Sequence, residues 1–165
     1  MNISKNVKNK IFSKETITSL FLVISVFIAD RVSKVAIINH QTKNQNIYVN
    51  DFLNFELVWN TGIGFGLLSQ NINMYYHLIS LLIFSVIVFL IYLIRKTDYS
   101  EKILYSLILG GALGNLYDRL IYLAVPDFID FHVNDFHWFT FNIADIFITI
   151  GIILIIIKDI IFKKK

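Results

Sequence analysis

Two aspartates, Asp127 and Asp145, stand next to the ends of consecutive apolar segments. Asp127 directly follows Pro126, and Asp145 closes the sequence FNIAD at the start of a long apolar run. Carboxylates that lie close together cannot both ionise comfortably, so such a pair shares a proton near neutral pH. The ionised member can then activate water while the protonated member hydrogen-bonds a peptide carbonyl. If they meet, the two residues predict hydrolysis, and the sequence does not decide which one holds the proton.

Further polar residues lie inside the apolar segments, where an ionisable group costs at least about 2.5 kcal/mol unless it is paired or used. Asp30 and Lys34 are four residues apart, so on a helix they share a face and can form an ion pair. We interpret this pair mainly as structural support. Asn142 lies three residues before Asp145, and Thr149 extends the same polar stripe.

The segment GGALGNLYDR brings another group of residues onto one helical face: Gly111, Asn115, Asp118 and Arg119. Gly110 and Gly114 form a small-xxx-small pair that is typical of tightly packed helices. Asp118 and Arg119 either neutralise each other or reach toward a neighbouring loop.

Composition defines the setting of these residues. Hydrophobic residues make up 56% of the 165 residues and charged residues only 16%, which favours a membrane protein. The chain has no cysteine, which excludes disulfides, thiolate nucleophiles and cysteine zinc sites. Its net charge of +3 comes from Lys and Arg at the edges of apolar stretches, so we expect no nucleic-acid partner.

Four stretches have the length of about 20 residues that a spanning helix needs. They run from Ile17 to Ile38, Tyr75 to Ile94, Ile103 to Leu123, and Phe141 to Phe162. We therefore predict a membrane all-α bundle of four transmembrane helices, with residues 1–165 forming one domain. The first stretch also resembles a signal-peptide core, but Asp30 and Arg31 follow it in place of a small-x-small cleavage site.

Positive charge predicts the orientation of the bundle. Lysines precede the first span and end the chain, and Arg95, Lys96 and Lys102 lie between the second and third spans. The loops 39–74 and 124–140, by contrast, contain a single basic residue, Lys43. The positive-inside rule places both termini in the cytoplasm and these two loops outside. Residues Ile47 to Trp59 alternate in polarity, which predicts a strand or hairpin and a small extracytoplasmic sheet.

These pieces, in this order, resemble the lipoprotein signal peptidases, the type II signal peptidases of the bacterial inner membrane, which are aspartic proteases. The resemblance covers nearly the whole chain. It is carried by residues 30–34 (DRVSK), 60–62 (NTG), 110–119 (GGALGNLYDR), 127–130 (DFID) and 141–145 (FNIAD). The chain departs from the family where Leu123 replaces a frequent glycine and where Ile63 and Gly64 follow the NTG turn.

The resemblance implies that Asp127 and Asp145 are the catalytic residues. A shared-proton dyad needs no metal to activate water, so we expect no metal or cofactor. The resemblance also implies that the following residues shape the site: Asp30, Lys34, Asn60, Gly62, Gly111, Asn115, Arg119 and Asn142. It further implies a prolipoprotein substrate whose cysteine carries diacylglycerol, contact of the acyl chains with membrane lipid, and inhibition by cyclic peptides of the globomycin type.

Two other classes of function remain open from the residues alone. Polar groups inside spans also build ion-coupled transporters, although the chain has no detectable inverted repeat. The other class is a metal-dependent enzyme, whose Mg²⁺ would be bound by oxygen ligands from Asp118, Asp127, Asp130 and Asp145. His132 and His137 match no recognised zinc pattern, so we interpret them as ordinary surface histidines.

Overall fold

The computed structural model describes residues 13–41, 47–62, 74–134 and 136–162, which form four helices and four strands. The helices are α2 (Lys14–Gln41), α3 (Met74–Lys96), α4 (Tyr99–Tyr122) and α5 (Ile143–Phe162). The strands are β1 (Ile47–Asn50), β2 (Leu53–Asn60), β3 (Val125–Val133) and β4 (Phe136–Phe141).

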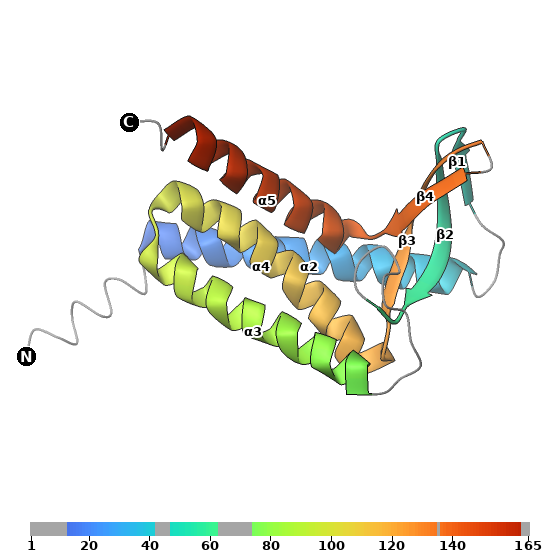
Figure 1. Ribbon diagram of the computed structural model, residues 1–165, viewed down its shortest axis with the longest axis horizontal. Coiled ribbons are helices and arrows are strands. Elements are labelled where there is room, and N and C mark those ends of the chain that lie inside the picture. Colours follow the sequence, from blue (N-terminus) through green and yellow to red (C-terminus); the bar gives the residue numbers. More distant parts are fainter. Residues whose placement is uncertain (1–12, 42–46, 63–73, 135, 163–165) are drawn as a thin grey trace, which may run out of the picture.

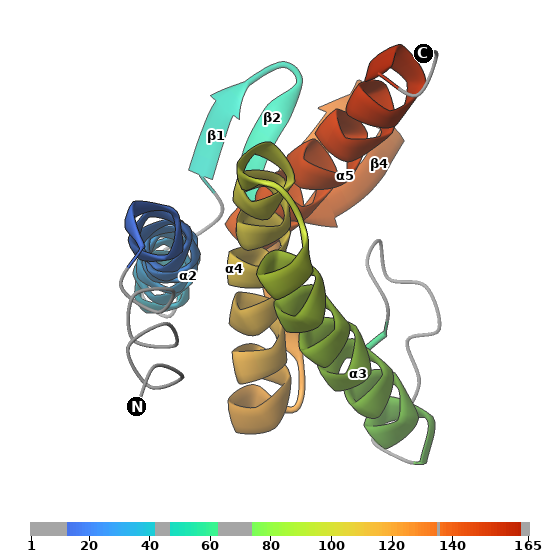
Figure 2. The ribbon, with the colours of Figure 1, turned by 90° about the vertical axis from the view of Figure 1, so that its left-hand side faces the viewer.

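Helix α4 is the centre of the bundle, because α2, α3 and α5 all pack against it (Figures 1 and 2). The sheet lies at one end of the helices, and α2 begins and α5 ends at the opposite end (Figure 1). The hydrophobic core around α4 contains the buried residues Ile87, Leu90, Ile108, Leu109, Ala112 and Leu116. The outward faces of all four helices carry large exposed apolar side chains such as Phe21, Leu81 and Ile160.

The structure confirms a helix in each of the four predicted stretches. By length and apolarity one helix of the described residues qualifies as a membrane span, Tyr76–Lys96, with a mean hydropathy of 2.7. The four-span arrangement therefore stays a prediction. The N-terminal lysines before Ser13, Lys43 and the C-terminal lysines after Phe162 lie outside the described residues.

The four strands form one antiparallel sheet in the order β1-β2-β3-β4. The hairpin predicted within Ile47 to Trp59 is confirmed as β1 and β2. We predicted residues 124–140 as an outer connection between spans and assigned no strands to it, whereas β3 and most of β4 lie within it. β3 lies between two other strands and most of its residues are buried on both faces, so it lacks the alternation that reveals a half-exposed strand.

Two contacts fix the sheet on the helices. Ile37 near the end of α2 packs against Phe128 and Ile129 of β3. The Gln41 side chain accepts a hydrogen bond from the Leu57 N–H at 2.8 Å and donates one to the Phe55 carbonyl at 3.2 Å. These backbone groups belong to an irregularity in the pairing of β2 with β3, so Gln41 supplies partners that the ladder lacks there.

The chain turns from α4 into β3 through Leu123, which has a left-handed backbone with φ 55°. An L side chain in this conformation costs about 1 kcal/mol relative to glycine. This is the position at which the family resemblance led us to expect glycine. The next residues include Pro126, which cannot continue a helix, and Asp127 follows directly on the new strand.

Candidate functional site

Asp127 lies on β3 at the junction of the sheet with the helices, and only 3% of it is exposed. Its carboxylate accepts a hydrogen bond from Asn60 Nδ2 at 2.9 Å and another from Asn142 Nδ2 at 2.6 Å. Burial, followed by the negative charge of Asp145, raises the pKa of Asp127 to about 7. The two amide hydrogen bonds oppose that shift without cancelling it. Asp127 is therefore able to keep a proton near neutral pH.

Asp145 occupies the first turn of α5, where the partial positive charge of the helix start favours a carboxylate. It makes a reciprocal capping pair with Asn142. The Asn142 side-chain oxygen accepts from the Asp145 N–H at 3.1 Å, and Asp145 Oδ2 accepts from the Asn142 N–H at 3.2 Å. The other carboxylate oxygen, Asp145 Oδ1, accepts a hydrogen bond from Asn115 Nδ2 at 2.8 Å.

Asn142 is the residue that joins the two carboxylates, and it is fully buried. One end of its side-chain amide bonds Asp127 and the other end caps the helix that carries Asp145. The strand and the helix therefore hold their aspartates through one shared side chain. We call Asp127 and Asp145 the carboxylate pair.

The predicted ion pair between Asp30 and Lys34 is confirmed, with 2.8 Å between Lys34 Nζ and Asp30 Oδ2. Both side chains are fully buried. The other oxygen of Asp30 accepts a hydrogen bond from the Ala144 N–H at 3.0 Å, so Asp30 also caps the first turn of α5. The pair on α2 thus fixes the helix that carries Asp145.

Lys34 uses all three of its donors, because it also bonds Asp118 Oδ2 at 2.7 Å and Asn115 Oδ1 at 2.9 Å. The second oxygen of Asp118 bonds the guanidinium of Arg31. We call Asp30, Arg31, Lys34 and Asp118 the ionic cluster; its formal charges sum to zero. The suggestion that Asp118 and Arg119 neutralise each other was wrong, since Asp118 pairs with α2.

Arg119 instead reaches the segment after β2, as the second interpretation expected, and donates a hydrogen bond to the Gly62 carbonyl. Its guanidinium lies 5.6 Å from the centre of the Tyr76 ring, and only 3% of the residue is exposed. Within the described residues its Nε and Nη1 atoms have no hydrogen-bond partner. The Gly62 N–H bonds Asn60 Oδ1 at 2.9 Å, which orients the amide that contacts Asp127.

Glycines on α4 allow this close approach. A Cβ on Gly111 would lie 2.6 Å from the Ala144 carbonyl oxygen of α5, and one on Gly114 would collide with the Asp30 carboxylate. Atoms cannot approach so closely without displacement, so these positions require glycine for packing. A Cβ on Gly110 would lie 2.8 Å from the Val26 Cβ of α2, so both members of the small-xxx-small pair, Gly110 and Gly114, agree with the packing interpretation.

The predicted site residues therefore come together around one junction of α2, α4, α5, β2 and β3. Sequence reasoning missed the roles of Arg31, Tyr76 and the capping pair. The Asn-x-x-Asp spacing of residues 142–145 before an apolar run is close to a capping box and would have indicated it. Nothing in the sequence indicated that Arg31 pairs with Asp118.

The histidine interpretation was partly wrong. His137 is 54% exposed in its side chain, as expected for a surface residue, but His132 is only 7% exposed as a residue. The four aspartates named as Mg²⁺ ligands do not converge in the described part of the chain. Asp118 bonds two cations, and the cluster with metal-ligand geometry consists of Asp130, His132 and His137.

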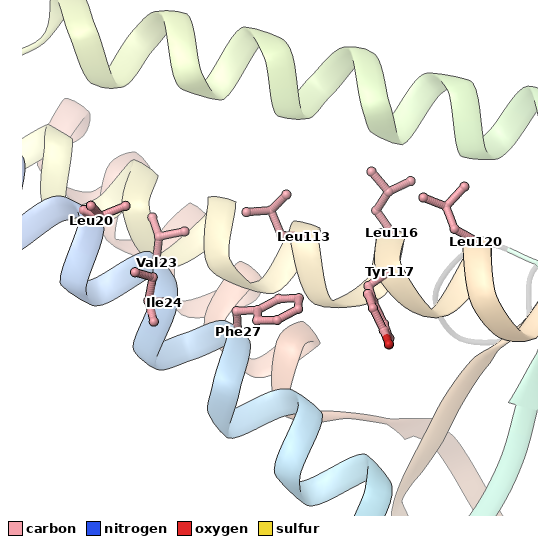
Figure 3. Close-up of a pocket in the computed structure, with 8 residues that line it drawn as sticks. All are labelled: Leu20, Val23, Ile24, Phe27, Leu113, Leu116, Tyr117 and Leu120. Carbon is pink, nitrogen blue, oxygen red and sulfur yellow. The ribbon is translucent and has the colours of Figure 1, made fainter.

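An apolar groove of about 480 Å³ lies between α2 and α4 (Figure 3). Its lining includes Leu20, Phe27, Leu113 and Leu120, and Tyr117 contributes the polar atom drawn in Figure 3. On α4 these leucines lie on the side of the helix away from Asn115 and Arg119. The groove therefore suits hydrocarbon and does not open on the carboxylate pair.

Comparison with known proteins identifies the family. The model of the signal peptidase (SPase) II family matches residues 22–161. The lipoprotein signal peptidase of Pelagibacter ubique is 44% identical over 95% of this chain and 96% of the relative, and that of Francisella tularensis subsp. novicida is 40% identical over 87% and 92%.

Two solved structures, both described as bacterial membrane enzymes, have TM-scores of 0.75 and 0.73. Both matches cover 90% of this chain. The first covers 92% of the solved chain at 34% sequence identity, and the second covers 94% at 32%. The chain therefore belongs to the signal peptidase II family and is a bacterial membrane peptidase.

Proposed function

We propose that this peptidase removes the signal peptide of prolipoproteins with Asp127 and Asp145 as an aspartic dyad. The observation that carries the proposal is that two carboxylates share Asn142 while Asp127 has a pKa of about 7. One proton on Asp127 and none on Asp145 is the state that acid-base hydrolysis requires. In the described residues neither carboxylate has an ion-pair partner that would fix both in the charged form.

In the proposed mechanism Asp145 accepts a proton from a water molecule as its oxygen attacks the peptide carbonyl. Asp127 donates its proton to the carbonyl oxygen, which gives a neutral tetrahedral diol. The proton on Asp145 then passes to the leaving amine while a diol proton returns to Asp127. The C–N bond breaks, the carbonyl reforms, and the pair regains its starting protonation.

The supporting residues act through position. Asn60 and Asn142 orient Asp127, Asn115 and the helix start orient Asp145, and the unused donors of Arg119 are available to a substrate carbonyl. Asp30 and Lys34 hold the start of α5, Gly111 permits its close approach, and Gly62 anchors Arg119. We assign none of these residues a proton-transfer step.

The substrate of this proposal carries diacylglycerol on the cysteine after the cleaved bond. Its acyl chains would stay among membrane lipid, and the apolar groove and the exposed apolar helix faces support such contact. Cyclic peptides of the globomycin type would occupy the cleavage site. The runner-up is a metal-dependent peptidase, for which the acidic side chains at the site are the only support.

Cleavage of a purified prolipoprotein by the purified peptidase tests this function. We expect the diacylglyceryl-modified precursor to be cut at the cysteine and the unmodified precursor to remain intact. Cleavage should persist in EDTA, because a shared-proton dyad needs no metal to activate water. Equal cleavage of both precursors would refute the substrate assignment, and loss in EDTA with recovery on adding one divalent ion would favour the metal enzyme.

The proposal includes four spans within one domain, with both chain ends in the cytoplasm and the sheet outside. The absence of cysteine allows a direct test with single cysteines in intact cells. Asp51→Cys in the exposed β1-β2 turn should react with a membrane-impermeant maleimide, whereas Asp98→Cys between α3 and α4 should react only after lysis. Labelling of Asp98→Cys in sealed cells would refute this topology.

A further inference from the structure

Three potential metal ligands gather on the hairpin formed by β3 and β4. His132 of β3 lies directly opposite His137 of β4, and Asp130 precedes His132 by two residues on the same strand. The two imidazole rings stack with 5.2 Å between their centres and 26° between their planes. One ligand atom of each of the three side chains lies within 4.8 Å of the other two.

The distances fit a small cation between the three side chains. Asp130 Oδ2 lies 2.8 Å from His137 Nδ1 and 3.4 Å from His132 Nδ1. Ligand atoms on a tetrahedral zinc ion stand about 3.4 Å apart, because each bond is about 2.0–2.2 Å long. The Asp130–His132 distance already matches this spacing, and the Asp130–His137 distance would have to lengthen by about 0.6 Å to match it.

His132 gives the second, independent indication of a ligand. It is buried, with 7% exposed, and its Nδ1 atom has no hydrogen-bond partner within the described residues. Buried polar atoms are almost always hydrogen-bonded, so an imidazole nitrogen that faces a carboxylate at 3.4 Å without a hydrogen bond is available to a further partner. Asp130 is itself 98% buried by residue, and its one oxygen Oδ2 faces both rings.

We infer that Asp130, His132 and His137 bind one divalent transition-metal ion, with Zn²⁺ as the fitting species. Two imidazoles and one carboxylate are a donor set that favours zinc over Mg²⁺ or Ca²⁺, which prefer oxygen ligands alone. His137 is 54% exposed in its side chain, so the ion can enter from solvent and keep water as a fourth ligand.

The metal would link β3 to β4 and would not take part in peptide hydrolysis. The hairpin connects α4 to α5; β3 carries Asp127, and Asn142 follows β4 directly. A metal bound across the hairpin therefore stiffens the connection between the two aspartates. This site is separate from the metal-enzyme alternative, whose ligands would include Asp127 and Asp145 themselves.

Zinc titration of the full chain tests the inference. The protein is purified in detergent with an affinity tag that contains no histidine, stripped with a chelator, and titrated against a chromogenic zinc indicator. We expect one equivalent of Zn²⁺ per chain, and a Co²⁺ form with the visible absorption of a four-coordinate site. When the free zinc concentration is about 100 times the dissociation constant, zinc should raise the Tm by about 5–10 °C.

The variants separate this site from nonspecific binding. His137→Ala and His132→Phe should each weaken zinc binding at least about 100-fold, and His137→Ala should abolish the Tm rise. The double variant His40→Ala/His77→Ala removes the two histidines elsewhere in the chain and should bind like the native protein. Because His137 also bonds the buried Asp130 carboxylate, the zinc-dependent rise in each variant is measured from that variant's own metal-free Tm.

Native binding no tighter than that of His137→Ala, or loss of binding in the His40→Ala/His77→Ala control, would overturn the inference. A misfolded His132→Phe would leave the His137→Ala result decisive. The measurement uses no peptidase assay, so its failure would leave the proposed dyad untouched.

Discussion

The carboxylate pair and the ionic cluster lie side by side, yet their partners differ in kind. In the cluster, Asp30 and Asp118 share the ammonium of Lys34, and Asp118 also bonds Arg31. In the pair, every hydrogen bond described comes from a side-chain amide or a backbone N–H. Buried Lys34 and partly exposed Arg31 neutralise the cluster, and no direct ion pair among the described residues neutralises Asp127 or Asp145.

This difference teaches how neighbouring buried acids are assigned different tasks. The cations of the ionic cluster link its carboxylates on α2 and α4 through direct ion pairs, so the cluster can hold these helices together. A buried carboxylate bonded only to neutral donors retains proton affinity. Asn115 marks the boundary, because its oxygen accepts from Lys34 and its nitrogen donates to Asp145.

The largest expected effect is on the chemical step of the carboxylate pair. Asp127→Asn and Asp145→Asn should each lower the single-turnover cleavage rate at least about 10³-fold, because an amide keeps the shape but cannot cycle a proton. Folding and binding of a globomycin-type peptide should be largely retained. Quenched single turnovers of modified prolipoprotein, after a thermal-stability check, provide the measurement.

Two variants control this result. The double variant should be scarcely slower than either single one, because residues that act as a unit give strongly non-additive losses. Asp130→Asn should retain measurable cleavage. A near-normal rate in either dyad variant, or an inactive Asp130→Asn beside an active Asp127→Asn, would show that the wrong carboxylate was chosen.

The next effect should appear in folding and not in chemistry. Lys34→Met leaves Asp30 and Asp118 without their shared cation, which costs about 3–5 kcal/mol for a buried ion group. We expect a clear loss of folded protein in the membrane and a lower Tm in detergent. Protein that does fold should keep its chemical rate within about tenfold.

Lys102→Met is the matched control, since Lys102 pairs at 2.9 Å with Glu15, whose side chain is 51% exposed. A pair of that kind contributes at most about 1 kcal/mol. If Lys34→Met folded normally, bound substrate normally and lost its chemical rate, the ionic cluster would belong to the chemistry and the comparison would fail.

Features that depend on local spacing could be predicted from the sequence. The i, i+4 spacing predicted the contact of Asp30 with Lys34, and alternation predicted the β1-β2 hairpin, because each pattern fixes its own neighbours. Leu123, where the family resemblance led us to expect glycine, has a left-handed backbone, which is the conformation that glycine adopts most easily.

Features that depend on tertiary partners could not be predicted. Asp118 is adjacent to Arg119 in sequence but pairs with Arg31 and Lys34, and only the packing of α2 on α4 decides between them. Strand β3 is buried between two neighbours, so no periodicity distinguished it from an apolar loop. The link through Asn142 likewise needs both the sheet and α5 in place.

The smallest effect concerns the proton on Asp127. Below the pKa of about 7 that burial and Asp145 give it, Asp127 carries the proton that the mechanism requires. Above that pH the proton is lost and both carboxylates are charged. We therefore expect kcat/KM for modified prolipoprotein to fall above about pH 7, approaching tenfold per pH unit, because kcat/KM reports ionisations of the free enzyme.

Asn60→Ala sharpens this prediction. The Asn60 amide stabilises the ionised form of Asp127, so its removal should raise the pKa of Asp127 and move the falling limb upward by about one pH unit. Asn54→Ala is the matched control, because Asn54 lies on the same strand and pairs with Asp130 in the ladder. The pH profile of this control should stay in place.

A falling limb that moved to lower pH in Asn60→Ala, or that moved equally in both variants, would mean that the pH dependence does not report the proton on Asp127. The protonated member would then have to be sought at Asp145, with the roles of the two carboxylates reversed.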